Sequence, residues 1–243
     1  MKTHEVTYFK CPACEFIQTE EPFWLEQAYS SAITSLDIGL ISRNLEFVPI
    51  TSTIIKSFVN KNGKFIDYGG GYGLLVRMMR DEGFDFYRQD IHCENLFAKN
   101  FDITDLTGTN KFEMLFAFEV MEHLVDPVQE IKKMLEYSDT ILFSTTLQPE
   151  NGNVLDWWYL APETGQHISL FSKKSLHVIA QNLGLNFETQ GVYHLFSKNK
   201  IDSRLFLKCF DKKYQTELNN KSKNPPSLLV PDFNKISGNK IKI

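Results

Sequence analysis

A cluster of glycines at residues 69–73 constrains the fold of this chain more than any other feature. An apolar run, residues 65–68, leads into the cluster, and a helix-like stretch, residues 74–82, follows it. Glycine allows sharp turns with positive φ, and without a Cβ it lets a ligand lie against the backbone. The next apolar run, residues 84–89, ends at Asp90, whose carboxylate can accept hydrogen bonds from ribose hydroxyls. This order predicts an α/β fold that binds a nucleotide.

The spacing of the glycines indicates which kind of nucleotide is bound. Dinucleotide-binding loops favour GxGxxG, whose third glycine permits close packing of helix on strand. Here Gly69, Gly71 and Gly73 form GxGxG, and Leu74 stands where the dinucleotide pattern has its third glycine. The segment resembles motif I of the class I S-adenosylmethionine (SAM)-dependent methyltransferases. That resemblance implies that the glycine loop holds the amino-acid end of SAM and that Asp90 holds its ribose.

The resemblance covers roughly residues 45–200. Residues 112–118 look like the family's fourth strand, residues 119–127 look like its E-x-x-E-H-x-x-D-P continuation, and residues 140–145 look like its fifth strand. The implied architecture is α/β, a Rossmann-like class I methyltransferase fold. Its sheet would be mostly parallel and seven-stranded, with helices on both faces and an N-terminal helical lid over the cofactor.

The apolar periodicity predicts the same alternation of elements. Strands are expected at residues 64–68, 84–89, 112–118 and 140–145, and helices at 74–82, 127–136 and 172–183. A third strand and helix are less distinct, and residues 95–101 are expected to supply part of them. Residues 187–197 predict one or two terminal strands. Strands that alternate with helices predict a parallel sheet covered on both faces.

Three regions are predicted along the chain: an N-terminal knuckle and helical lid (1–60), a SAM-binding catalytic domain (61–200) and a polar C-terminal extension (201–243). In the first region, helices are expected near residues 22–30 and 37–60, with Pro49 opposing one continuous helix. From about residue 211 the chain is rich in Lys and Asn. That composition predicts a poorly ordered tail or strap.

The residues expected to contact SAM lie in or beside the predicted loops. Asp102 follows a short predicted strand and could face the adenine amino group. Arg43, on a helix before the first strand, could reach the SAM carboxylate; the alternative for Arg43 is a solvated helix face. The predicted cofactor-binding set is Asp67, Gly69, Gly70, Gly71, Gly73, Asp90, Ile91, Asp102, Glu119 and Arg43.

Two carboxylates and an imidazole follow the predicted strand at residues 112–118. If a helical turn begins at Glu119, then Glu119, Glu122 and His123 share one face. They could border the cofactor through ordinary hydrogen bonds, or they could ligate a divalent ion such as Mg²⁺ or Zn²⁺ with His167 as the fourth ligand. The pattern is similar to the E-x-x-E-H of small-RNA 2′-O-methyltransferases and ubiquinone-pathway O-methyltransferases. That similarity implies a metal for some relatives and none for others.

A loop rich in aromatic residues, 156–167, follows the predicted strand at 140–145 and should arch over the same sheet edge. Trp157, Trp158 and Tyr159 suit the wall of a site for a planar or sugar substrate, because flat rings stack and exclude water. His167 is the first candidate for a general base and His123 the second, since imidazole titrates near neutrality. The alternative is that the aromatic residues pack a lid and that His167 is structural.

Cys11 and Cys14 form a C-x-x-C pair, which supplies two of the four thiolates that a closed zinc site needs. Cys93, Cys209, His4 or another subunit would have to complete such a site. The alternatives are a turn with two buried thiols and a redox pair. Some sugar C-methyltransferases carry an N-terminal zinc ribbon with two such pairs, and the motif resembles half of one.

Composition narrows the class of partner. The net charge is −4, which gives no bulk attraction for duplex nucleic acid or an anionic membrane. The N-terminus lacks the apolar core of a signal peptide, so a cytoplasmic location is expected. The expected acceptor is a small molecule or a saccharide, and a homodimer is left open.

The sequence therefore predicts a SAM-dependent methyltransferase that methylates an oxygen atom with the help of a histidine base or a divalent metal. Two alternatives stay open: a SAM-binding module without catalysis, and a nicotinamide-dependent oxidoreductase. Leu74 at the third-glycine position and the E-x-x-E-H stretch argue against the oxidoreductase.

Overall fold

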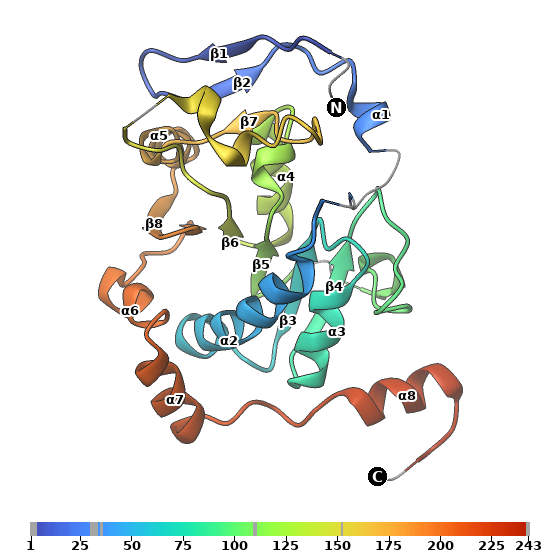
Figure 1. The fold of residues 1–243 in the computed structure, drawn as a ribbon. Helices are drawn as coiled ribbons and strands as arrows, with labels where there is room; N and C mark the ends of the chain where they lie inside the picture. Colours follow the sequence, from blue (N-terminus) through green and yellow to red (C-terminus); the bar gives the residue numbers. More distant parts are fainter. Residues whose placement is uncertain (1–3, 30–33, 35, 109–110, 152, 242–243) are drawn as a thin grey trace.

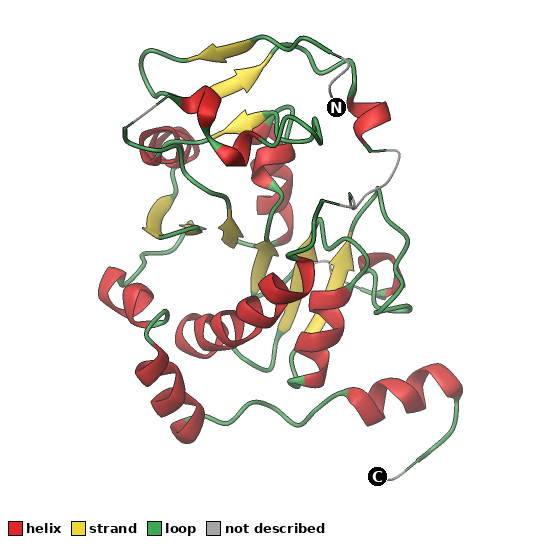
Figure 2. Cartoon of the chain, viewed as in Figure 1, coloured by secondary structure: helices red, strands yellow, loops and turns green. Residues whose placement is uncertain are grey.

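The computed structural model describes residues 4–29, 34, 36–108, 111–151 and 153–241. A six-stranded sheet in the order β4-β3-β5-β6-β9-β8 forms its centre (Figures 1 and 2). Strands β3, β4, β5 and β6 are parallel, and β9 and β8 complete the sheet in antiparallel pairing. The strands are β3 (Lys64–Tyr68), β4 (Asp85–Gln89), β5 (Met114–Ala117), β6 (Thr140–Ser144), β8 (Asn186–Gln190) and β9 (Tyr193–Ser197).

Helices cover both faces of this sheet, as predicted. Helices α2 and α3 pack against each other in front of it in the view of Figure 1, and α4 and α5 lie behind. Their bounds are α2 (Leu40–Phe58), α3 (Leu74–Asp81), α4 (Pro127–Tyr137) and α5 (Lys173–Leu183). Apart from residues 95–101, the strands and helices expected between residues 64 and 197 are confirmed to within a few residues at their ends, so the α/β methyltransferase-like architecture holds.

The seventh strand is not formed within the described residues. Where it would pair with β4 there is one isolated parallel bridge, Arg88 to Asp102. The chain leaves the sheet at once because Asp102 caps the short 3₁₀ helix η1 (Ile103–Asp105) in a reciprocal capping box. Residues 95–101 form turns rather than part of a strand and helix. The prediction of seven strands is corrected to six.

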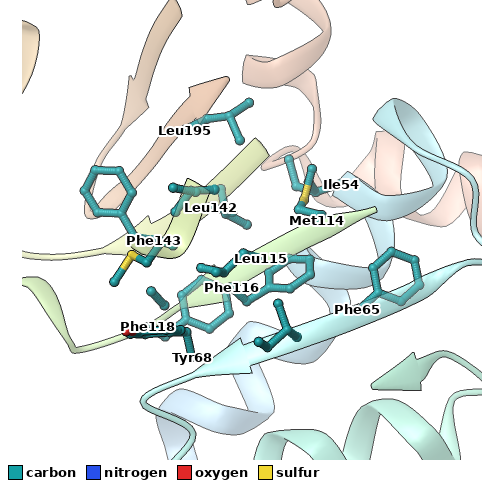
Figure 3. Close-up of a cluster of buried hydrophobic side chains, with 14 of the residues drawn as sticks. Ile54, Phe65, Tyr68, Met114, Leu115, Phe116, Phe118, Leu142, Phe143 and Leu195 are labelled. Carbon is teal, nitrogen blue, oxygen red and sulfur yellow. The ribbon is translucent and has the colours of Figure 1, made fainter. Parts of the chain in front are cut away.

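Aromatic side chains fill the space between sheet and helices. Phe65 on β3 stacks on Phe86 of β4, with ring centroids 5.3 Å apart, and Phe86 lies 5.2 Å from Phe116 of β5. All four residues of β5 are buried, which is expected for a central strand covered on both faces. Figure 3 shows Phe116 of β5 and Leu142 and Phe143 of β6 among the buried side chains of this core. The close packing fixes the carboxyl ends of β3, β4, β5 and β6 relative to one another.

Pro49 lies inside α2, which runs without interruption. The expectation that Pro49 opposes one continuous helix is wrong. Pro49 is on the exposed side of the helix, whereas Phe47, Ile50 and Ile54 are buried in the core on the other side. Packing of that apolar face compensates for the one backbone hydrogen bond that proline cannot make.

A second, smaller sheet covers the carboxyl ends of the main strands (Figure 1). It consists of β1 (Tyr8–Lys10), β2 (Ile17–Thr19) and β7 (Ser169–Leu170), all antiparallel. Gln18 donates to the carbonyl of Val125 (2.6 Å), and Ser169 donates to the carbonyl of Leu124 (2.6 Å). The N-terminal region therefore contributes a β-hairpin as well as the short helix α1 (Leu25–Ala28).

The C-terminal extension is helical and wraps around the domain as a strap. It contains α6 (Ser203–Lys208), α7 (Lys212–Lys221) and α8 (Leu229–Ser237), and it passes α2 before reaching α3 (Figure 1). Asp232 of α8 and Arg80 of α3 form a buried bidentate ion pair at 2.7 and 2.8 Å. Arg80 also donates to Asp85 at 2.6 Å. The expectation of poor order is corrected, because this ion pair and the α7–α2 contacts fix the segment.

Replacing Asp232 with asparagine is expected to lower the free energy of unfolding by about 3 kcal/mol, because it leaves the buried Arg80 guanidinium partly unpaired. Urea denaturation of the wild type and the variant measures this loss. Asp81→Asn is the matched control, since Asp81 pairs with Arg77 at an exposed position and should cost less than about 1 kcal/mol. Equal losses in the two variants would show that the strap is not held by the buried pair.

None of the helices in the described ranges is long and apolar enough to cross a bilayer.

Candidate active site

The glycine loop lies at the carboxyl end of β3. Gly69, Gly71 and Gly73 all have positive φ (+68°, +52° and +83°). A Cβ on Gly69 would meet Val120 at 2.7 Å, and one on Gly73 would meet Asn95 at 2.6 Å, whereas one on Gly71 would meet no atom within 4 Å. The outer glycines therefore allow the loop to pack, and Gly71 borders open space where a ligand can approach the backbone.

Asp90 closes the loop from the end of the neighbouring strand. Its Oδ2 accepts from the Gly71 amide (2.9 Å), and its Oδ1 accepts from the amides of His92 (2.7 Å) and Cys93 (2.9 Å). The next residue, Ile91, leaves 82% of its surface exposed. The structure thus places Asp90 and Ile91 side by side with the glycine loop, which suits a ribose and an adenine ring.

Sequence reasoning missed Arg88, a buried residue on β4 that joins these parts. Its Nε donates to Asp102 at 2.6 Å, and its Nη1 donates to the carbonyls of Cys93 (2.9 Å) and Gly71. The only sequence signal was a cation inside the apolar run at residues 84–89. Asp102 is consequently engaged with Arg88 and with Asn95, and its role toward adenine stays a prediction.

Asp67 is buried beneath the loop. Burial, together with the charge of Asp90, raises the pKa of Asp67 to about 8, against the opposing influence of Arg88. A cation bound above the loop would favour its ionised form. Asp67 is therefore suited to face the positively charged end of a ligand.

Arg43 Nη2 donates to both carboxylate oxygens of Asp37 (2.8 and 2.9 Å), and Arg43 Nε lies 3.6 Å from the Glu119 carboxylate. It is held at the edge of the site in this way. Within the predicted N-terminal knuckle and lid (1–60), residues 1–3, 30–33 and 35 lie outside the described ranges.

Glu119 does not share a helical face with Glu122 and His123, and this expectation is corrected. Its backbone has φ of +55°, and the 3₁₀ helix η2 (Met121–His123) begins only after it. Ser144 at the end of β6 donates to the Glu119 carboxylate at 2.6 Å and accepts from its amide at 2.8 Å. Burial and the charge of Glu122 raise the pKa of Glu119 to about 7.

Glu122, His123 and His167 do come together. A carboxylate oxygen of Glu122 and one ring nitrogen of each histidine lie within 4.8 Å of one another. The Glu122 side chain is completely buried, and neither of its oxygens has a hydrogen-bond partner of ordinary geometry among the described residues, although the Tyr159 hydroxyl lies close enough to interact with it. A buried carboxylate without a partner costs free energy unless another group satisfies it. The cluster therefore fits a divalent cation, and Glu119 falls outside it.

The histidine tautomers are set by backbone carbonyls. His123 Nδ1 lies 3.1 Å from the carbonyl of Gln166 and 2.9 Å from the hydroxyl of Tyr29, and His167 Nδ1 contacts the carbonyl of Tyr159. A carbonyl can only accept, so a proton on each Nδ1 satisfies both carbonyls and leaves each Nε2 with a free lone pair, and the Tyr29 hydroxyl can accept from His123 in that arrangement. Burial, assisted by the charge of His167, lowers the pKa of His123 to about 3, so His123 is neutral at pH 7. Neutral imidazoles with a free Nε2 are the form that binds metals.

The aromatic loop divides into a buried and an exposed part. Tyr159, in the 3₁₀ helix η4 (Trp158–Leu160), is buried with its ring 4.6 Å from that of His167. Burial and the nearby Glu122 and Glu119 raise the pKa of Tyr159 well above its ordinary value. Trp157 is half-buried, whereas Trp158 is 75% exposed. Of the three, Trp158 is available to an acceptor, and Tyr159 packs beneath the cluster.

The other site residues predicted from the sequence lie apart from this cluster. Cys11 and Cys14 occupy the turn between β1 and β2, formed by residues 11–16. Gly70 belongs to the loop and packs closely over Asp67, because a Cβ there would lie 2.7 Å from its carboxylate.

Comparison with known proteins agrees with this geometry. The Rossmann-like sheet with a glycine loop and an acid at the ends of adjacent parallel strands defines a class I SAM-dependent methyltransferase. The model of the family described as "Methyltransferase domain" matches residues 43–190, and the chain belongs to this family. SAM is therefore its methyl donor, and the oxidoreductase alternative is excluded.

Two solved structures illustrate the likeness. The 1,6-didemethyltoxoflavin-N1-methyltransferase of Burkholderia thailandensis shares the fold, with a TM-score of 0.51 at 11% identity over 80% of this chain and 97% of that one. The mitomycin 7-O-methyltransferase MmcR gives a TM-score of 0.43 at 14% identity, over 71% of this chain and 59% of that one. No curated protein sequence matches the chain significantly.

The buried Asp67 predicts a pH dependence of stability. Its folded-state pKa, about 8, lies above the ordinary 3.8, so between these values the folded protein binds more protons than the unfolded one. The contribution of Asp67 to the stability of SAM-free protein should therefore fall as the pH rises from about 4 to about 8, whereas the lowered pKa values of the buried His123 and His194 contribute with the opposite sign below about pH 6.5 in both proteins. Asp67→Asn removes only the Asp67 contribution, so in thermal unfolding at several pH values the variant should gain stability relative to the wild type as the pH rises. Identical profiles would contradict the assignment; Glu119 adds a smaller dependence of the same sign to both proteins.

Proposed function

We propose that the protein transfers the methyl group of SAM to a hydroxyl oxygen of a small molecule, with a saccharide as the favoured class. In this proposal, Glu122, His123 and His167 hold a divalent cation beside the acceptor. The observation that carries the proposal is the fully buried Glu122 carboxylate, whose oxygens have no hydrogen-bond partner of ordinary geometry among the described residues and which faces two histidines. Burying such a group is costly unless a cation satisfies it.

The proposed cofactor position follows the carboxyl edge of the sheet. The methionine end of SAM would lie over residues 69–73 with its cationic groups toward Asp67. Its ribose would meet Asp90 and its adenine would cover Ile91, whose exposed surface would then be buried. Methyl transfer is an in-line displacement, so the positioning of donor and acceptor supplies much of the acceleration.

Methyl transfer also requires an acceptor oxygen that can attack the methyl group of SAM. The cluster would activate that oxygen. A divalent ion bound there would lower the pKa of an acceptor hydroxyl and fix its orientation. Glu122 would supply a carboxylate oxygen, and His123 and His167 would supply their Nε2 atoms, with the ring orientations fixed by the carbonyls of residues 166 and 159. The small sheet and Tyr159 exclude water from one side of the cluster.

The acceptor class is supported by the exposed surface beside the cluster. Trp158 offers a flat apolar face, which stacks well on a sugar ring or another planar group. The net charge of −4 gives no attraction for duplex nucleic acid.

A direct assay of S-adenosylhomocysteine (SAH) formation tests this function. Metal-stripped protein is supplied with SAM and a panel of glycosides, phenols and amines, with and without Mg²⁺, Mn²⁺ or Zn²⁺. We expect SAH formation with hydroxyl acceptors that requires the added ion and is abolished by chelator. Turnover confined to amines would contradict oxygen transfer. Binding of SAM without SAH formation for any acceptor would favour a non-catalytic module.

A second mechanism is favoured by the geometry of His167. Because its Nδ1 is fixed by the carbonyl of Tyr159, its Nε2 could accept the proton of the acceptor directly. In that case the same assay would show full turnover with hydroxyl acceptors in chelator, and His167→Ala would abolish it.

A further inference from the structure

The C-x-x-C pair forms a rigid knuckle outside the active site. Cys11 and Cys14 lie in the tight turn that joins β1 to β2, where the Cys11 amide donates to Phe16 (2.8 Å) and the Glu15 amide donates to Cys11 (2.9 Å). Glu15 has φ of +66°, which reverses the chain. The backbone amides of Cys14 and Ala13 and the Cys14 thiol lower the pKa of the Cys11 thiol, which places these groups beside its sulfur. Two thiols are thus held together at one end of the small sheet.

The knuckle is anchored from both sides. Ser172, at the start of α5, donates to the carbonyl of Cys14 at 2.8 Å, and Gln148 donates to the carbonyl of Glu15 at 2.9 Å. Neither thiol is fully buried. An anchored pair of accessible thiols is preorganised for a ligand that binds both sulfurs.

The chain itself does not complete a metal site here. Within the described residues, the one group of three or more potential ligands is the cluster at Glu122. Cys93 lies beside Asp90, Cys209 is buried against Ser57, and His4 contacts Gln27 near α1. None of the residues outside the described ranges is Cys, His, Asp or Glu. The described residues therefore leave two of the four ligand positions of a closed zinc site to be supplied from elsewhere.

We propose that Cys11 and Cys14 bind a structural zinc ion together with the same two cysteines of a second copy of this chain. Structural zinc is tetrahedral and takes four protein ligands, and two knuckles related by a twofold axis supply four thiolates. The surface beside the knuckle fits a second copy. Strand β1 is an edge strand of its sheet, and Phe9 on it is 62% exposed. An unpaired edge with an exposed aromatic ring favours association.

Zinc binding at the knuckle would affect the active site through the small sheet. Strand β2 follows the knuckle and pairs with β7, which begins two residues after His167. A dimer clamped at the knuckle would hold this sheet in place over the cluster. The inference does not depend on the proposed function, because the knuckle and the cluster share no residue.

Metal stoichiometry and mass, measured on the same full-length sample, test the proposal. Reduced, metal-free protein is titrated with Co²⁺ and then Zn²⁺, and its mass is measured by light scattering after gel filtration. We expect a thiolate-to-cobalt absorption band that saturates at one ion per two chains. The mass should double from the 28.1 kDa of one chain. A His167→Ala background removes any contribution of the Glu122 cluster to the ion count.

Matched serine variants separate the knuckle from the other thiols. Cys11→Ser/Cys14→Ser should lose the absorption band and the metal-dependent dimer while keeping its circular dichroism spectrum, whereas Cys93→Ser should keep both the band and the dimer. The proposal is overturned by a thiolate-bound ion in a protein that stays at the mass of one chain. It is also overturned if reduced protein with both thiols free shows no thiolate-to-cobalt band.

Discussion

Replacing Glu122 with glutamine is expected to abolish divalent-metal binding at the cluster and to lower kcat about 10²–10³-fold. The amide keeps the shape of the carboxylate but removes the charge that holds the cation, and Lewis-acid stabilisation of several kcal/mol is lost with it. Affinity for SAM should change little, because Glu122 lies outside the glycine loop. Calorimetric titration with Mn²⁺, a SAM titration and the SAH assay together measure the three quantities.

The stability of the Glu122→Gln variant provides an independent check. In metal-free protein, the variant should unfold at a higher temperature than the wild type, because it removes a buried carboxylate that has no hydrogen-bond partner of ordinary geometry in the described part of the chain. Glu136→Gln, at an exposed position on α4, is the matched control and should change neither activity nor stability. A Glu122→Gln protein that retains wild-type activity and Mn²⁺ affinity would remove the cluster from the mechanism.

Replacing Asp90 with alanine is expected to weaken SAM binding about 100-fold. The carboxylate accepts hydrogen bonds from three backbone amides, one in the glycine loop and two in the loop that follows β4. It would accept hydrogen bonds from the ribose hydroxyls as well. Hydrogen bonds to a charged group contribute about 1.5–3 kcal/mol each, so the loss of the ribose contacts and of loop order accounts for this factor.

Calorimetry with SAM and SAH measures the loss of affinity. Asp90→Asn should fall between the wild type and Asp90→Ala, since the amide can still accept but carries no charge. Asp139→Asn, at the exposed beginning of β6 and so at the opposite end of the sheet, should bind SAM normally. Wild-type affinity in Asp90→Ala would place the cofactor elsewhere.

The sequence predicted the parallel core well, because local patterns and the fold agree there. Apolar runs, a glycine cluster and capping signals such as Ser172 before α5 and Gly184 after it act within a few residues of where they occur. These signals located the strands of the main sheet and the acid at the end of β4.

The parts that the sequence did not predict depend on contacts between distant segments. Pro49 is accommodated in α2 because the opposite side of that helix is buried. The C-terminal helices are fixed by the pair of Arg80 with Asp232, 152 residues apart. Strand β7 has only two residues and exists because it pairs with the N-terminal hairpin. None of these contacts leaves a local pattern.

The candidate site shows the same division. The grouping of Glu122 with His123 follows from their adjacency, and the contribution of His167 was a prediction that the geometry supports. Glu119 was assigned to the same face on the assumption of regular helix, but its positive φ and Ser144 turn it away. The role of Arg88 was not predicted, because its partners, Asp102 and two loop carbonyls, come together only in the folded chain.

The most direct test is a crystal structure of the protein with SAH and Mn²⁺, recorded so that manganese gives anomalous scattering. We expect SAH over the glycine loop with its ribose at Asp90, and one manganese peak bound by Glu122, His123 and His167. SAH bound there with no manganese at these three residues would contradict the metal-assisted mechanism, and SAH bound elsewhere would contradict the cofactor site itself.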